Sequence, residues 1–136
     1  MTLHLSGWNE SFEQAFSAYR SQGLAPARVA REDRDRYLLF TAAGERPGEL
    51  SGRLRHEART RADLPAVGDW VAVRDEGALA VIHAVLPRAS VFARKAAGEV
   101  TEEQVVAANV DTVFVVAGLD GDFNPRRIER YLAAAW

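Results

Sequence analysis

The stretch DWVAVRDEGALAVIHAVL, from Asp69 to Leu86, decides the fold of this chain. Its two apolar runs, residues 69–74 and 79–86, are rich in valine, alanine and isoleucine and flank the polar turn at residues 75–77. Short β-branched runs on either side of a glycine-containing turn are typical of a β-hairpin. The stretch therefore predicts two antiparallel strands in the second half of the chain.

Three further strands are expected before this hairpin. Residues 28–31 and 36–41 flank the polar connection 32–35, and residues 49–56 follow a turn from Gly44 to Gly48. Five short strands are the number found in a small OB-fold barrel, and closure removes the unpaired edges of an open sheet. We therefore expect a mainly β protein built on a five-stranded OB-fold barrel.

A helix is expected in front of the strands, capped by Asn9 or Ser11 and ended by Gly23 and Pro26. One side of this helix is apolar. That stripe consists of Phe12, Ala15, Phe16 and Tyr19. We interpret the stripe as a face that docks on the rest of the domain, with a groove in a partner as the alternative.

Trp70 has two possible roles in this arrangement. Strand alternation places it with Ala72, on the face opposite Val67, Val71 and Val73. It is either exposed for stacking on a base or buried beneath the first helix. We favour burial, because a large aromatic face is seldom left uncovered.

The residues after the barrel predict the start of a second unit. Residues 91–98 are interpreted as a linker, and the capping-box pattern at 101–104 predicts a short helix over 102–108. The near-continuous apolar run 110–116 predicts a strand covered on both faces in a parallel sheet. Asn124-Pro125 then supplies a cap and a first-turn proline for a helix over 125–136.

A strand followed by a helix is half of a βαβ unit, and the second parallel strand is not in this chain. We therefore expect the chain to be the front part of a longer protein. The alternative is that residues 110–116 pair with their copy in another molecule, giving a dimer.

Composition places the chain among globular proteins. Of its 136 residues 48% are hydrophobic and 26% charged, and the net charge is −2. It has no cysteine, no apolar run of about eighteen residues and no signal-peptide pattern. These features predict a cytoplasmic protein without disulfides or a membrane partner.

The chain lacks the common catalytic and nucleotide-binding motifs. It contains no P-loop, no G-x-G-x-x-G, no H-E-x-x-H and no G-x-S-x-G, and its histidines have no metal-site spacing. His83 and Asp111 are interpreted as structural, the latter in a turn beside Asn109. No catalytic, nucleotide-binding or metal-ligating residue is predicted.

Basic residues concentrate on the third predicted strand and the loop that leaves it, where only Glu57 opposes them. On a strand, Arg53 and Arg55 would share a face. OB barrels bind nucleic acid across a strand face and the adjoining loops, using cations for phosphates. The candidate RNA-binding residues are Arg53, Arg55, His56, Arg59 and Arg61, extended by Arg34 and Arg36 on the first hairpin and by Lys95. The alternative is a solvated, salt-bridged surface.

Four stretches in this order resemble motifs of the ribosome small subunit-dependent GTPase A family, RsgA. They are LPAVGDWV at 64–71, LPRASVFARK at 86–95, VAANVDTVFVV at 106–116 and NPRRIERYL at 124–132. The resemblance spans nearly the whole chain, from Gly7 onward, and concerns the N-terminal portion of that family. It implies an OB domain, then a circularly permuted GTPase domain and a zinc-binding region.

The resemblance also implies a role in late maturation of the small ribosomal subunit, with its rRNA as partner and GTP hydrolysis as activity. GTP, magnesium and zinc are implied for the whole protein, but the residues that bind them would lie beyond Trp136. We therefore expect no cofactor and no GTP binding in residues 1–136. The expected division is a helical arm at 1–24, the OB domain at 25–95, and a linker helix with the start of the GTPase domain at 96–136. A stand-alone RNA-binding OB module and a self-associating structural fragment are the alternatives.

Overall fold

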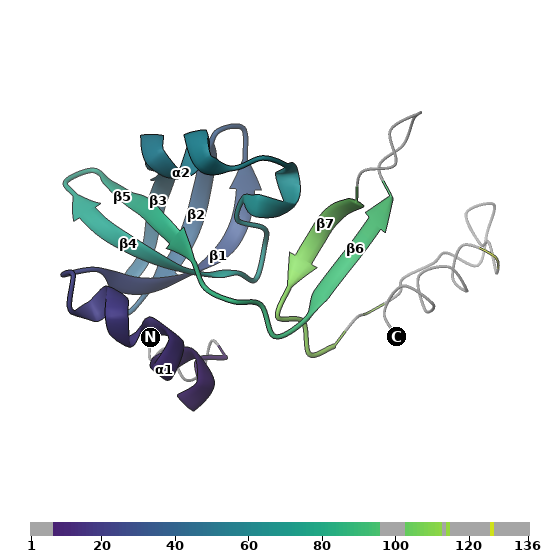
Figure 1. The fold of residues 1–136 in the computed structure, drawn as a ribbon, viewed down its shortest axis with the longest axis horizontal. Coiled ribbons are helices and arrows are strands. Elements are labelled where there is room, and N and C mark those ends of the chain that lie inside the picture. Colours follow the sequence, from purple (N-terminus) through teal and green to yellow (C-terminus); the bar gives the residue numbers. More distant parts are fainter. Residues whose placement is uncertain (1–6, 96–102, 113, 115–125, 127–136) are drawn as a thin grey trace.

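The computed structural model describes residues 7–95, 103–112, 114 and 126. Five strands form a closed barrel in the order β1-β2-β3-β5-β4 (Figure 1). These strands are β1 (Ala25–Asp33), β2 (Arg36–Thr41), β3 (Gly44–Leu50), β4 (Trp70–Glu76) and β5 (Leu79–Val85). Only the β3–β5 pair is parallel. The prediction of a mainly β protein with a five-stranded OB-fold barrel is confirmed.

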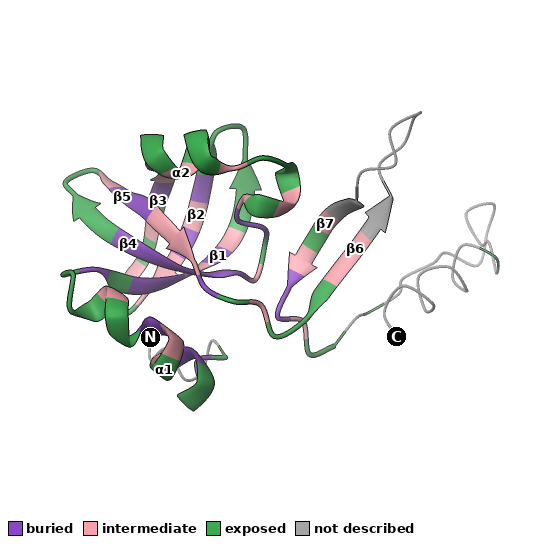
Figure 2. Cartoon of the chain, in the orientation of Figure 1, coloured by how far each residue is buried: buried purple, intermediate pink, exposed green. Residues whose placement is uncertain are grey.

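Alternation along β4 divides its residues between two apolar clusters. Val71 and Val73 point into the barrel, where they pack with Leu39 and Ile82. Trp70 and Ala72 point outward and are covered by α1 (Glu10–Arg20). Figure 2 shows the resulting pattern, with buried residues following the barrel strands and one side of α1. β4 therefore serves as the shared wall of both clusters.

The first helix and the burial of Trp70 beneath it agree with prediction. The Asn9 side chain accepts a hydrogen bond from Phe12 N at 3.1 Å, which caps α1. Phe12 and Phe16 are buried against Trp70, which has no exposed surface. The Trp8 ring lies 4.7 Å from that of Trp70 in an edge-on arrangement. Trp70 is a structural residue and is not available to stack on a base.

The third strand lies earlier in the sequence than predicted. Residues 44–48, expected to be a turn, form most of β3, and residues 49–56 are divided between β3 and the helix α2 (Gly52–Glu57). The glycines and Pro47 suggested a turn. β3 tolerates Pro47 because residues 44–47 pair only with β2, and pairing with β5 begins at Gly48.

The residues after the barrel form a second small sheet, contrary to prediction. β6 (Val91–Lys95) and β7 (Glu103–Ala108) are antiparallel partners, so neither a linker at 91–95 nor a helix at 103–108 is present. Val105 and Val106 favour a strand, and pairing with β6 overrides the local capping pattern. Figure 1 shows the β6–β7 hairpin beside the barrel.

Most of the predicted strand–helix unit lies outside the described residues. Residues 110–112 and Phe114 belong to no helix or strand, and residues 113, 115 and 116 are not described. Of the predicted helix over 125–136, only Arg126 is described, in helical conformation. Dimerisation through residues 110–116 stays a prediction. Among the described residues, no helix has the length and apolar character needed to cross a membrane.

Candidate nucleic-acid interface

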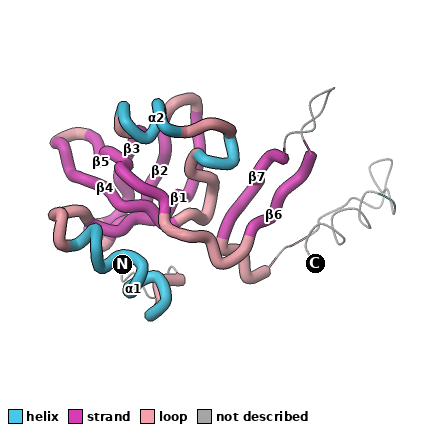
Figure 3. Tube along the Cα trace, viewed as in Figure 1, coloured by secondary structure: helices cyan, strands magenta, loops and turns pink. Residues whose placement is uncertain are grey.

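The connection between β3 and β4 contains five of the predicted RNA-binding residues. Ser51 begins α2, because its side chain accepts a hydrogen bond from Leu54 N at 3.1 Å. The 3₁₀ turn η2 (Arg61–Asp63) follows. Figure 3 shows this connection lying over one end of the barrel. The predicted arginines therefore cover a barrel end instead of extending a strand.

The prediction that Arg53 and Arg55 share a strand face is wrong, because both lie on α2. Residues two apart on a helix point in different directions. Arg53 Nε pairs with Glu57 Oε1 at 3.0 Å on the solvent side of the helix. Arg55 instead reaches across to the β1–β2 turn, where its NH1 lies 3.5 Å from Asp35 Oδ1.

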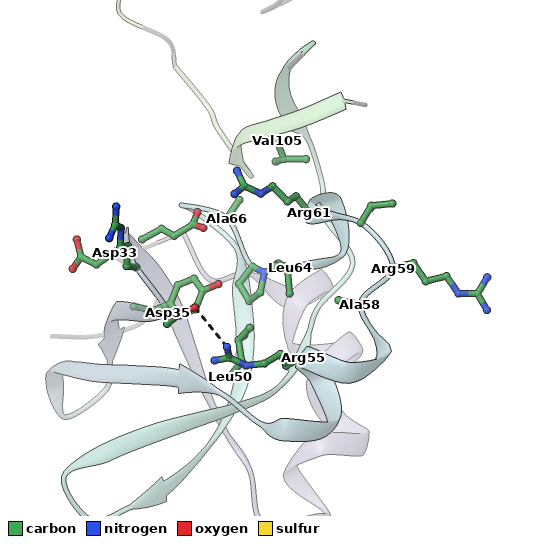
Figure 4. A pocket seen from close by; sticks show the side chains of 15 residues that line it. Asp33, Asp35, Leu50, Arg55, Ala58, Arg59, Arg61, Leu64, Ala66 and Val105 are labelled. Carbon is green, nitrogen blue, oxygen red and sulfur yellow. Dashed lines mark ion pairs between the residues drawn. The ribbon is translucent and has the colours of Figure 1, made fainter. Parts of the chain in front are cut away.

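A hollow of about 810 Å³ lies between the β1–β2 turn and the β3–β4 connection (Figure 4). Residues 32–35 form one side, residues 58–61 and 64–66 form the other, and Val105 of β7 contributes from the hairpin. Four of the predicted RNA-binding residues line this hollow: Arg34, Arg55, Arg59 and Arg61. The structure thus unites arginines from two separate parts of the sequence.

The four arginines differ in whether an acidic side chain interacts with them. Arg55 pairs with Asp35, and the charge of Arg61 acts on Glu32. Arg34 and Arg59 have no ion pair among the described residues, and the guanidinium of Arg59 extends outward in Figure 4. Arg34 and Arg59 therefore retain the charge that a phosphate would need.

The other predicted residues do not line the hollow. Arg53 and His56 are exposed elsewhere on α2, and Arg36 is exposed at the first position of β2. Lys95 ends β6, and its side chain lies outside the described part of the chain. Four of the eight candidates thus line the hollow, and RNA binding by any of the eight stays a prediction.

Burial changes the acidity of two groups in the hollow. It raises the pKa of Tyr37 to about 12, and the nearby charge of Glu32 acts in the same direction. It also raises the pKa of Glu32, while the positive charge of Arg61 opposes that shift. The Tyr37 hydroxyl is therefore protonated throughout the neutral range.

Sequence reasoning missed the ion pair that holds one wall of the hollow in place. Asp69 is completely buried, and it accepts hydrogen bonds from Ala66 N at 2.7 Å and from Arg88 Nε at 2.9 Å. Arg88 also donates to the carbonyl oxygens of Ala62 and Leu64, each at 3.0 Å. The hydrogen bonds that Arg88 donates to the Asp69 carboxylate are the main cause of a raised Arg88 pKa. Arg88 thus anchors the loop that contains Arg61.

A second polar group joins the hairpin to the barrel. Asn109 adopts a left-handed backbone with φ of 56°. Its Oδ1 accepts from Ala89 N at 2.7 Å, and its Nδ2 donates to Gly68 O at 3.0 Å. Arg28 donates to the carbonyl oxygens of Gly68 and Asn109, both at 3.0 Å, with its guanidinium over the Trp70 ring. Asn109 and Asp111, which were expected in a turn, both lie in bends after β7.

This junction unites the family-like stretches at 64–71, 86–95 and 106–116, which are separated in the sequence. In the sequence, the only indication that Asp69, Arg88 and Asn109 matter was that they lie within these three stretches. The pairing itself could not be determined, because a buried carboxylate's partner depends on which segments the barrel brings together. Among the described residues, no group of histidine, aspartate and glutamate side chains could hold a metal ion.

Comparison with known proteins gives one consistent family. The family model described as RsgA GTPase matches residues 85–136. The small ribosomal subunit biogenesis GTPase RsgA of Opitutus terrae is 53% identical over 145 residues, covering 99% of this chain and 40% of the relative. That of Syntrophotalea carbinolica is 46% identical, covering 97% of this chain and 38% of the relative.

A solved structure supports the fold. The crystal structure of YloQ, a circularly permuted GTPase, matches with a TM-score of 0.51 and 16% identity, over 80% of this chain and 35% of that one. The chain spans about 40% of the length of the curated relatives it matches. The chain belongs to the RsgA family, whose members in this comparison are named small ribosomal subunit biogenesis GTPases.

Proposed function

We propose that the surface around the hollow binds ribosomal RNA and thereby docks the protein on the small ribosomal subunit. The observation that carries this proposal is the gathering of Arg34, Arg55, Arg59 and Arg61 around one hollow of an OB barrel. Arginine forms bidentate hydrogen bonds with phosphate, and OB barrels use such cations to follow a nucleic-acid backbone. The names of the relatives supply the small subunit as the partner.

The whole protein, in this proposal, is a cytoplasmic GTPase that acts with Mg²⁺ during late maturation of the small subunit. The part described here is its docking module, consisting of α1 and the barrel, and the residues after 95 begin the GTPase domain. The described residues offer no donor set for Mg²⁺ or for the zinc that the resemblance implies.

The triple variant Arg34→Ala/Arg59→Ala/Arg61→Ala tests the docking surface. These three side chains line the hollow and lie outside both apolar clusters, so their removal is expected to spare the fold. Binding to isolated small subunits should weaken, and the slope of log K against log salt should become shallower by about 2 to 3. Filter binding over a salt series measures both quantities.

Arg74→Ala is the matched control, because Arg74 is an exposed arginine of β4 that does not line the hollow. It should leave affinity and salt slope close to those of the parent chain. An affinity and a slope unchanged in the triple variant would move the interface to another part of the surface.

A further inference from the structure

Tyr37 is a buried core residue whose hydroxyl has no hydrogen-bond partner among the described residues. Tyr37 is only 5% exposed and packs in the barrel core, yet it also lines the hollow. No hydrogen bond joins its hydroxyl to any other described residue. Because the hydroxyl is not fully enclosed by protein atoms, it opens into the hollow, where it can donate to a polar atom of a ligand.

Glu32 places an acceptor beside this donor. The two residues are direct partners across the β1–β2 ladder, so their side chains project to the same side of the sheet. Glu32 also lines the hollow, and its carboxylate has no hydrogen bond among the described residues. The positive charge of Arg61 favours the ionised form of the Glu32 carboxyl. The hollow therefore presents a hydroxyl donor and a carboxylate acceptor side by side.

The remaining lining suits a planar ring with a phosphate on each side. Leu50 and Leu64 provide apolar contact surface, while Arg34 and Arg59 line the hollow without an ion pair among the described residues. A hollow of about 810 Å³ is large enough for one nucleotide. Proteins that recognise RNA by sequence commonly bind such splayed-out bases and read their Watson–Crick edges.

We propose that the hollow binds a single unpaired guanosine, with the Glu32 carboxylate accepting from its N1–H and N2–H groups and the Tyr37 hydroxyl donating to O6. Guanine matches best because its edge presents two neighbouring donors and one acceptor, whereas adenine and cytosine each present a donor beside an acceptor. The inference rests on the proposed function and adds base recognition to phosphate contact. It assigns the guanosine to an RNA strand, since Arg34 and Arg59 line the same hollow and can bind the flanking phosphates.

The test uses RNA hairpins that differ only at one unpaired loop nucleotide, which is guanosine, inosine or adenosine. The parent chain should bind the guanosine hairpin about tenfold more tightly than the adenosine hairpin. Inosine lacks the N2 amino group and should fall between them. Fluorescence anisotropy measures these affinities, and equal binding of all three hairpins would overturn the proposal.

Tyr37→Phe removes only the hydroxyl and should lower the guanosine affinity about fivefold, with no effect on the adenosine hairpin. Glu32→Gln should likewise reduce the preference for guanosine over adenosine. Tyr19→Phe is the control, because Tyr19 lies on α1 away from the hollow. Urea unfolding of each variant confirms that the fold is retained, and a full guanosine preference in both hollow variants would refute the assignment.

Two further outcomes separate this inference from the docking proposal and from a free nucleotide. If the triple arginine variant loses affinity for every hairpin while the parent chain shows no base preference, docking by phosphate contact stands and guanosine recognition fails. GMP should compete only weakly. Competition by GMP as strong as that by the guanosine hairpin would assign the hollow to a free nucleotide and overturn the RNA assignment.

Discussion

The barrel and the β6–β7 hairpin are stabilised by different forces. The barrel encloses an apolar core and pairs every strand on both sides. The hairpin has two strands, and Val91 and Val106 on it are 45% and 42% exposed. A two-stranded sheet is marginal by itself in water. The position of the hairpin therefore depends on the hydrogen bonds of the polar junction around Asp69 and Asn109. The barrel, in contrast, is stabilised mainly by apolar burial.

The largest expected effect is at the buried ion pair of this junction. Asp69→Ala leaves Arg88 partly buried without its counter-charge and removes the acceptor of Ala66 N. Breaking a buried pair in this way costs about 3–5 kcal/mol of unfolding free energy. Urea denaturation measures this loss. Hydrogen exchange should show that the Ala108 amide, which donates to Val67 O, loses protection first.

Asp75→Ala is the comparison for that variant, because Asp75 pairs with Arg46 on the surface. Exposed pairs contribute about 0–1 kcal/mol. A loss of stability in Asp75→Ala as large as that in Asp69→Ala would remove the distinction between buried and surface pairs.

The next prediction concerns the apolar core of the barrel. Leu39 has no exposed surface in the barrel core, and Leu39→Ala should cost about 3 kcal/mol through lost burial and the cavity left behind. Loss of amide protection should then begin in β2 and β3 and not at Ala108. If Leu39→Ala and Asp69→Ala expose the same amides in the same order, the barrel and the hairpin unfold as one unit.

A smaller effect is expected at the closest backbone approach between hairpin and barrel. Gly68 has φ of 91°, and a Cβ atom there would overlap the carbonyl oxygen of Ala108. Gly68→Ala should cost about 2 kcal/mol, since it combines backbone strain with displacement of β7. Gly77→Ala is matched in φ, at 80°, but nothing lies within 4 Å of its added methyl group. Equal unfolding free energies for the two variants would show that contact with Ala108 contributes nothing.

The smallest effect concerns pH and vanishes near neutrality. The pKa of Tyr37 is about 12 in the folded chain and 10.0 ordinarily, so folding favours the neutral phenol. Its contribution is fully present below pH 10 and is lost as the pH rises from 10 to 12. Urea denaturation between pH 9 and 11 should show a steeper loss in the parent chain than in Tyr37→Phe. Identical slopes would contradict the buried, neutral phenol.

Prediction from the sequence succeeded where burial alternates locally. The apolar runs at 36–41 and 69–86, the Asn9 cap and the two-sided pattern around Trp70 correspond to β2, β4, β5, α1 and the buried tryptophan. It failed at residues 49–56 and 103–108, where polar and short apolar segments fit more than one periodicity. Half of the candidate RNA-binding residues line one hollow, but Arg53 and Arg55, which were expected to share a strand face, lie on the helix α2.

The sequence by itself determined which faces are apolar, where the main strands lie and that the chain resembles the RsgA family, because each of these is encoded in residues near one another. Only the tertiary structure decided that α2 crosses the barrel end, that β6 pairs with β7 and that Arg88 finds Asp69. These contacts depend on barrel closure, which brings together segments far apart in the chain. The hollow lined by Tyr37 and Glu32 is one result of that closure.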